Sequence, residues 1–140
     1  MHEERVRIRW RDLDAYGHVN NAVYLTYLEE SRDAWVREVL GPVTDTWDFV
    51  LARVAIDYRE ELTQDDEEVV VACRLERIGR SSITTREEIR KRDGTLAAEA
   101  SSVIVPRDPS TGRSRPLRDE ERAALEAALA ADAGERRARR

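Results

Sequence analysis

A short polar segment near the start of the chain carries residue types that can attack a carbonyl group. Two acids, Asp12 and Asp14, are followed by a glycine turn and then by Asn20 and Asn21. Asn favours the N-cap of a helix, where the first backbone N–H groups lack internal acceptors and lie at the positive end of the helix dipole. Such N–H groups stabilise a developing oxyanion, and a nearby carboxylate can attack or activate water. The segment therefore predicts a carbonyl-attack site in which Asp14 is the nucleophile or the base.

The residues that follow must form the helix that supplies those N–H groups. Side chains recur at helical spacing from this point on, which predicts a helix that starts near Asn20 or Asn21. The Gly41-Pro42 pair is a helix breaker. The predicted buried face consists of Tyr24, Tyr27, Leu28, Ser31 and Trp35.

Extended segments surround this helix. Val6, Ile8 and Trp10 alternate with arginines, which predicts a first strand with one buried face. One long helix and about five long strands predict an α+β domain in which an antiparallel sheet, arranged as a meander, wraps around the helix. The later strand-like segments span residues 49–60, 67–78, 81–92 and 95–106.

The end of the chain changes in composition. Three acids at 119–121, followed by Leu125 and Leu129, predict a short C-terminal helix with acids in its first turn. The basic residues that end the chain predict a disordered tail over 132–140. We therefore expect a single domain over residues 1–131, since 140 residues suit one hydrophobic core.

Composition excludes several classes of protein. A net charge of −5 and a pI near 5.2 argue against a nucleic-acid binder. No apolar run is long enough to cross a membrane and no signal-peptide pattern is present, so we expect a cytoplasmic protein. Cys73 is the only cysteine, which rules out an internal disulfide, and its alternating segment predicts a small buried core residue.

The strongest pattern is the string D-x-D-x-x-G-H-V-N-N-x-x-Y-x-x-Y-x-E-x-x-R, from Asp12 to Arg32. It resembles the hotdog-fold acyl-CoA thioesterases of the 4-hydroxybenzoyl-CoA thioesterase type. The resemblance implies that Asp14 is the catalytic carboxylate and that the backbone N–H of Asn21 polarises the thioester carbonyl, without a metal or dissociable cofactor. It extends over roughly residues 5 to 125, through Ala55-Ile56-Asp57-Tyr58, Ile78-Gly79-Arg80-Ser81-Ser82, Asp93-Gly94 and Thr111-Gly112-Arg113-Ser114-Arg115-Pro116-Leu117.

The same resemblance suggests where the coenzyme lies and how the protein assembles. Arg80, Ser81 and Ser82 occupy positions where relatives place residues near the pantetheine arm and the phosphates. Relatives form dimers with active sites at the subunit interface, and dimers often pair into tetramers. Geometry alone also favours a homodimer, because one helix covers one face of the sheet and leaves its other face and edges unprotected.

Other residues of the motif have secondary predicted roles. His18 is expected to support the turn rather than act as the base, and Gly17 to shape the turn around the substrate. Tyr24 and Tyr27 are predicted to line the acyl pocket or to join the core. Glu29 is a competing carboxylate, because one hotdog subgroup places its catalytic acid on the helix, but it could equally pair with Arg32.

The chain departs from the family pattern at several positions. Many relatives carry a proline where this chain has Glu60 and Glu61, and a glycine where it has Gln64. Tyr16 stands where acyl-carrier-protein thioesterases have an Asn, so the triad of that branch is not expected. Three alternatives to an acyl-CoA thioesterase remain: an acyl-carrier-protein thioesterase, a hotdog hydratase and a non-catalytic acyl-CoA-binding module.

Overall fold

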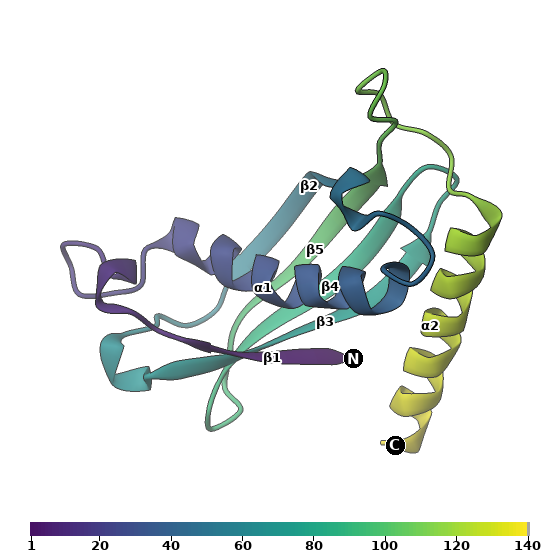
Figure 1. Cartoon of the computed structure of the whole chain (residues 1–140). Helices are drawn as coiled ribbons and strands as arrows, with labels where there is room; N and C mark the ends of the chain where they lie inside the picture. Colours follow the sequence, from purple (N-terminus) through teal and green to yellow (C-terminus); the bar gives the residue numbers. More distant parts are fainter. Residues whose placement is uncertain (140) are drawn as a thin grey trace.

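A five-stranded antiparallel sheet and two long helices make up residues 1–139, the part of the chain that the computed structural model describes. Helix α1 lies across one face of the sheet, and α2 crosses the end of the sheet near the N-terminus (Figure 1). The order along the chain is β1 (His2–Arg7), α1 (Asn21–Leu40), β2 (Phe49–Tyr58), β3 (Glu68–Ile78), β4 (Ile83–Lys91), β5 (Leu96–Pro106) and α2 (Asp119–Ala138).

Helix α1 begins where the sequence predicts. Asn20 is the N-cap, and its side-chain oxygen accepts a hydrogen bond from the Ala22 N–H at 2.9 Å. This bond satisfies one of the N–H groups that a helix start leaves without a partner. The predicted helical face is confirmed, because all of its members are buried: Tyr24, Tyr27, Leu28, Ser31 and Trp35.

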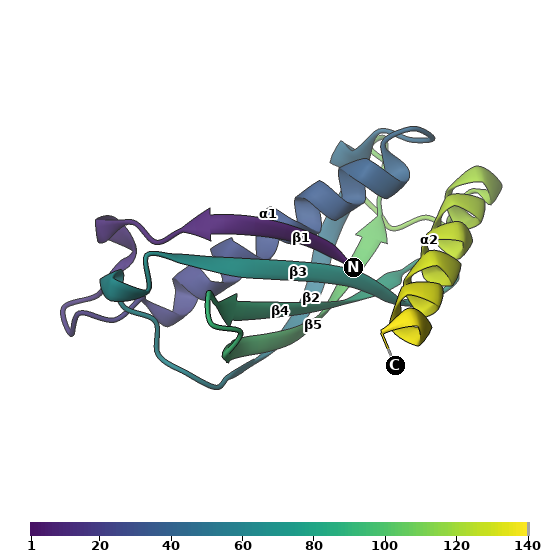
Figure 2. The ribbon, with the colours of Figure 1, turned by 90° about the horizontal axis from the view of Figure 1, so that it is seen from below.

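The strands lie side by side in the order β1-β3-β4-β5-β2, and every pair is antiparallel. The predicted meander is confirmed for β3, β4 and β5. Strand β2 departs from it, because it pairs with β5 rather than with its successor β3, and the connection from β2 to β3 crosses the sheet. Figure 2 shows β1 and β3 side by side near one edge of the sheet. Strands β1 and β2 are therefore the two edges.

The first strand is shorter than the sequence predicts. Strand β1 ends at Arg7, and a single turn of 3₁₀-helix follows at Trp10–Asp12. Ile8 is buried as expected, but Trp10 is 82% exposed, so the prediction that it shares the buried face is wrong. The cause is local: the Asp12 carboxylate accepts the Arg9 N–H at 2.9 Å, which closes the turn and ends the alternation of the strand.

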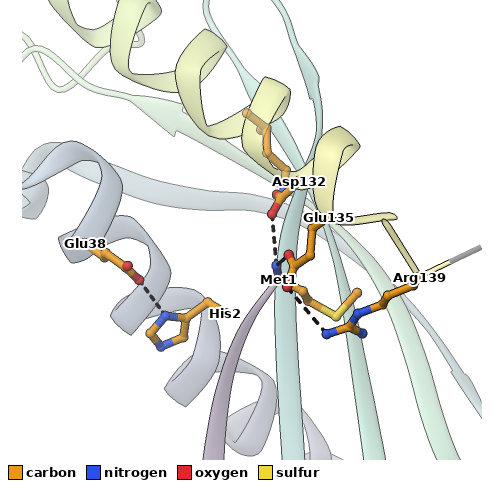
Figure 3. Close-up of polar contacts among 7 residues, drawn as sticks. Met1, His2, Glu38, Asp132, Glu135 and Arg139 are labelled. Carbon is orange, nitrogen blue, oxygen red and sulfur yellow. Dashed lines mark hydrogen bonds and ion pairs between the residues drawn. The ribbon is translucent and has the colours of Figure 1, made fainter. Parts of the chain in front are cut away.

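Helix α2 is longer than the short helix that the sequence predicts. It runs from Asp119 to Ala138, so residues 132–138 are helical where a disordered tail was expected, while Arg140 lies outside the described residues. Side-chain contacts explain the difference: the N-terminal ammonium of Met1 bonds the carboxylates of Asp132 and Glu135 (Figure 3). These contacts hold the end of α2 against the start of β1.

Figure 3 also shows how the start of β1 meets α1. The His2 imidazole contacts the carboxylate of Glu38 at 2.7 Å and that of Glu4 at 2.8 Å. Burial alone would lower the pKa of His2, but the two carboxylates outweigh it and raise the pKa above its ordinary value. The imidazole therefore links β1 to the last turns of α1.

Two apolar clusters form the core. One surrounds the N-terminal half of α1 and includes Tyr27, Leu28 and Leu62. The other joins the C-terminal half of α1 to α2 and includes Trp35 and Leu125. Within residues 1–139, no helix is both long and apolar enough to span a membrane.

Candidate active site

The turn that carries Asp14 is closed by its own hydrogen bonds. The Asp14 N–H donates to the His18 carbonyl at 2.8 Å, and the Gly17 N–H donates to the Asp14 carbonyl at 3.2 Å. Gly17 has φ +82°, a conformation that favours glycine. One carboxylate oxygen of Asp14, Oδ1, accepts the N–H groups of Tyr16 at 2.8 Å and His18 at 3.4 Å. Asp14 is thus a turn carboxylate, and its Oδ2 accepts no hydrogen bond from residues 1–139.

The turn is attached to the segment that follows β2. Val19 donates its N–H to the Leu62 carbonyl at 2.8 Å, and His18 forms an isolated β-bridge with Thr63. The His18 Nε2 atom lies 3.2 Å from the Glu61 carboxylate. These contacts attach the turn at His18 to the segment that follows β2.

The start of α1 lies next to this turn. The Asn20 N–H donates to the Asp12 carbonyl at 2.9 Å, so the N-cap is tied to the segment that carries Asp14. Asn21 is the first helical residue, and its N–H has no acceptor among residues 1–139. A free N–H at a helix start is a ready donor to a carbonyl oxygen that becomes negative.

A cavity of about 850 Å³ joins these groups. Asp14, His18, Asn21 and Tyr24 all line it. The structure therefore brings together the predicted carboxylate and the predicted oxyanion donor. The other lining residues are Val19, Tyr58, Arg59, Glu60, Glu61, Thr63, Asp66 and Lys91.

Acidic and basic residues both line the cavity, and most of them form ion pairs. Lys91 Nζ lies 3.6 Å from an Asp66 oxygen, and Arg59 donates to Glu99 at 2.9 Å. Asp14 makes no ion pair within the described residues, 1–139. Its carboxylate thus remains available to a substrate or a water molecule in the cavity.

The predicted tyrosines have different positions. Tyr24 lines the cavity, and its hydroxyl donates to the Glu60 carbonyl at 2.9 Å. Burial raises the pKa of Tyr24 to about 12, so its hydroxyl stays protonated and acts as a donor. Tyr27 does not line the cavity; it is buried, and its hydroxyl donates to Asp12 at 2.7 Å. Asp12 is therefore a structural residue, since its carboxylate accepts hydrogen bonds from Tyr27 and Arg9.

The three residues predicted to contact the coenzyme do not line this cavity. Arg80, Ser81 and Ser82 form the turn between β3 and β4, at the opposite end of β4 from Lys91. Nine residues of strand separate the two ends, which is about 25 to 30 Å. Within one chain, this turn therefore does not line the Asp14 cavity.

The competing carboxylate Glu29 lies in a different cavity. This second cavity, of about 410 Å³, is lined by one face of α1 and by the start of β2, including Arg32, Trp47 and Leu51. Within one chain, Glu29 therefore does not share a cavity with Asn21. Arg32 donates to Glu87 at 2.8 Å, so the predicted pairing of Glu29 with Arg32 is not formed.

Sequence reasoning did not assign a role to Tyr58, although the residue falls in a quoted motif. It is the last residue of β2, lines the Asp14 cavity and donates its hydroxyl to the Asn21 carbonyl at 2.8 Å. Its ring meets that of Tyr24 edge to face, with centroids 5.0 Å apart. The sequence signal for a role of Tyr58 is a tyrosine at the end of a predicted strand, next to charged residues.

This chain is similar to known thioesterases over most of its length. The sequence model of the thioesterase-like superfamily matches residues 8–126. The long-chain acyl-CoA thioesterase FadM of Escherichia coli (strain K12) is 28% identical over 131 residues, which cover 89% of this chain and 96% of FadM.

Solved structures show the same fold. A thioesterase from Thermus thermophilus, crystallised with coenzyme A and Zn, is 33% identical with a TM-score of 0.81, covering 92% of this chain and 95% of that one. A predicted thioesterase from Bacillus stearothermophilus is 27% identical, also with a TM-score of 0.81, covering 91% and 96%. The sheet around α1 is the hotdog fold that the sequence motif implies. Because the superfamily model matches most of its length, this chain belongs to the thioesterase-like superfamily.

Proposed function

We propose that this protein hydrolyses the thioester bond of an acyl-CoA, giving a free carboxylic acid and coenzyme A. The observation that carries the proposal is that the Asp14 carboxylate and the free N–H of Asn21 line one cavity. The E. coli relative named as a long-chain acyl-CoA thioesterase and the T. thermophilus thioesterase crystallised with coenzyme A support the substrate class.

In the proposed reaction, the thioester carbonyl oxygen accepts a hydrogen bond from the Asn21 N–H at the positive end of α1. Asp14 either removes a proton from water as it attacks the carbonyl carbon or attacks that carbon itself, in which case water then cleaves the resulting anhydride. The C–S bond breaks, and the thiolate that leaves takes up a proton. A thioester has a good leaving group, so one carboxylate and one oxyanion donor are sufficient for this chemistry.

Thiol release from short, medium, long and aromatic acyl-CoAs tests the proposal on wild type, Asp14→Asn and Asp93→Asn. Asp93 is a matched control, because it is also a turn aspartate whose Oδ1 accepts a backbone N–H, from Thr95 at 2.9 Å. We expect Asp14→Asn to lose most turnover and Asp93→Asn to keep it. Wild-type release by a folded Asp14→Asn protein would contradict the assignment.

We also propose that the active form is a homodimer that pairs through the β2 edge, and that such dimers can assemble into tetramers. Strand β2 has one unpaired edge, and large apolar side chains are exposed on or beside it: Trp47 is 87% exposed, and Leu51 and Tyr58 are each 46% exposed. An open edge with exposed apolar groups favours pairing with a second copy. The acyl-CoA substrate also supports a cytoplasmic location.

Analytical ultracentrifugation of Leu51→Arg tests the assembly. A charge at this edge should oppose pairing, so the variant should sediment as a smaller species than wild type. Arg53→Lys, on the same strand, conserves charge and is the control. A monomeric wild-type protein with full activity would contradict the dimer.

A further inference from the structure

Two short segments carry the reacting groups of the proposed reaction. We call Asp12–Asp14 the base segment and Asn20–Asn21 the donor segment. The residues between them form a turn that is largely exposed, with Ala15, Tyr16 and Gly17 open to solvent. Catalysis requires the carboxylate and the N–H to hold their separation closely, because a displacement of about 1 Å can cost about a hundredfold in rate. Contacts from outside the turn must therefore set that separation.

Tyr27 holds the base segment from inside the core. Its hydroxyl donates to the Asp12 carboxylate at 2.7 Å, and the same carboxylate accepts the Arg9 N–H at 2.9 Å. Burial alone would raise the pKa of Asp12, but the bonds from Arg9 and Tyr27 outweigh it and lower the pKa. Since Tyr27 belongs to α1 and is 1% exposed, its bond fixes the base segment relative to the helix.

Tyr58 holds the donor segment from the sheet edge. Its hydroxyl donates to the Asn21 carbonyl at 2.8 Å, and its ring packs edge to face on Tyr24. Asn21 is the first residue of α1 and Tyr58 the last residue of β2. The bond therefore fixes the start of the helix relative to the sheet.

The two segments are also joined directly. The Asp12 carbonyl accepts the Asn20 N–H at 2.9 Å, so a shift of either segment is transmitted to the other. The two tyrosine hydroxyls bond this pair of segments at two separate points, one in the core and one at the end of β2. Neither hydroxyl is free to act on a substrate, because each already donates to a protein acceptor.

We propose that Tyr27 and Tyr58 are positioning residues that together set the separation between the Asp14 carboxylate and the Asn21 N–H. This inference rests on the proposed thioesterase function. Removal of either hydroxyl should allow its segment to drift and slow the chemical step, while the cavity wall that binds the substrate stays in place. The effect should therefore fall on kcat and not on KM.

The test measures kcat and KM for Tyr27→Phe, Tyr58→Phe and the double variant, with the best acyl-CoA of the panel. We expect each single variant to lose about tenfold in kcat with KM within about twofold of wild type. The double variant should lose less than the product of the single losses, because both bonds set one separation. Ser31→Ala is the control: Ser31 is a fully buried residue of α1 whose hydroxyl donates to the Leu28 carbonyl at 3.1 Å, away from both segments. It should keep wild-type kcat.

The outcomes separate this inference from the function on which it rests. Turnover that survives in Asp14→Asn would overturn the thioesterase assignment. Turnover that is lost in Asp14→Asn but unchanged in both phenylalanine variants would overturn only the positioning role. A rise in KM at constant kcat in Tyr58→Phe would also overturn it, since Tyr58 would then only line the cavity. If Tyr27→Phe does not fold, the half-exposed Tyr58 supplies the decisive kcat measurement.

Discussion

Arg32 donates a hydrogen bond to Glu87 at 2.8 Å in the contact between α1 and the sheet, where both side chains are buried. The same guanidinium lies 3.4 Å from the Ser102 hydroxyl, and Thr85 donates to the other Glu87 oxygen at 3.1 Å. Burial raises the pKa of Glu87 above its ordinary value even with Arg32 beside it. The pair lies between helix and sheet at a depth where a lone charge is costly.

Replacing only Arg32 should lower the free energy of unfolding more than replacing Arg32 and Glu87 together. Arg32→Met leaves Glu87 buried without its cation and should lower the free energy of unfolding by about 3 to 5 kcal/mol. A carboxyl whose folded pKa is raised stabilises the fold below its unfolded pKa and loses that contribution as pH rises. The stability of Arg32→Met should therefore fall as the pH rises above 4.5, the ordinary pKa of this carboxyl. Urea unfolding at pH values on both sides of 4.5 measures this fall, and Arg32→Met/Glu87→Leu should recover most of the loss. A double variant as unstable as the single one would contradict this account.

At the start of α2, Glu121 should make the stability of the fold depend on pH in the opposite direction to Glu87. Glu121 is fully buried and accepts two hydrogen bonds from Arg115, at 2.8 and 2.9 Å, and one from the Arg118 N–H at 2.8 Å. Burial alone would raise the pKa of Glu121, but these bonds lower it from 4.5 to about 2. A lowered folded pKa stabilises the fold above the unfolded value, and that contribution is lost as pH falls from about 4.5 towards 2.

Glu121→Gln should therefore destabilise the protein at neutral pH by about 2 to 3 kcal/mol, and wild type and variant should converge only as the pH approaches about 2. Chemical unfolding at several pH values measures both curves. Curves that stay parallel down to the lowest pH would show that the ionised carboxylate is not the source of the stability.

Gly17 offers a test of how the turn presents Asp14. Its φ is +82°, and an added Cβ would meet no atom within 4 Å, so Gly17→Ala costs only backbone strain, about 1 to 2 kcal/mol. Gly112 is a matched control, with φ +72° and equally open surroundings in the loop after β5. Both variants should lose similar stability, and only Gly17→Ala should lose kcat. Equal kcat in the two variants would contradict this role, because it would show that a change in the backbone at Gly17 does not affect how Asp14 is positioned.

Cys73 should be inert in the folded protein. It is fully buried in β3, and burial, with the nearby Glu87 carboxylate, raises the pKa of its thiol. Iodoacetamide should leave the native protein unmodified at mildly alkaline pH and alkylate it fully in guanidinium chloride, as mass spectrometry would record. Rapid labelling of native protein would show that β3 opens or that the thiol is accessible.

Local patterns in the sequence predict those parts of the structure that depend on near neighbours. The Asn20 cap, the buried stripe of α1 from Tyr24 to Trp35 and the alternation of β3 all follow from residues a few positions apart. The motif also predicts that Asp14 and Asn21 act together, because both lie within one short segment. Two local patterns give wrong predictions. Trp10 continues the alternation of the first strand, but the Asp12 turn interrupts that strand. The basic residues at the end of the chain suggest disorder, but Asp132 and Glu135 in the same segment hold α2 to the start of β1.

Only the tertiary structure decides which distant groups meet. Strand β2 pairs with β5, a choice that alternating apolar residues leave open, and this pairing brings Tyr58 to Asn21, 37 positions away. Arg32 and Glu87, 55 positions apart, become partners because burial makes an unpaired charge costly. The turn formed by Arg80, Ser81 and Ser82 lies far from the Asp14 cavity because the whole length of β4 separates them. Sequence spacing sets which side chains share a face, whereas strand order and burial determine what those faces contact.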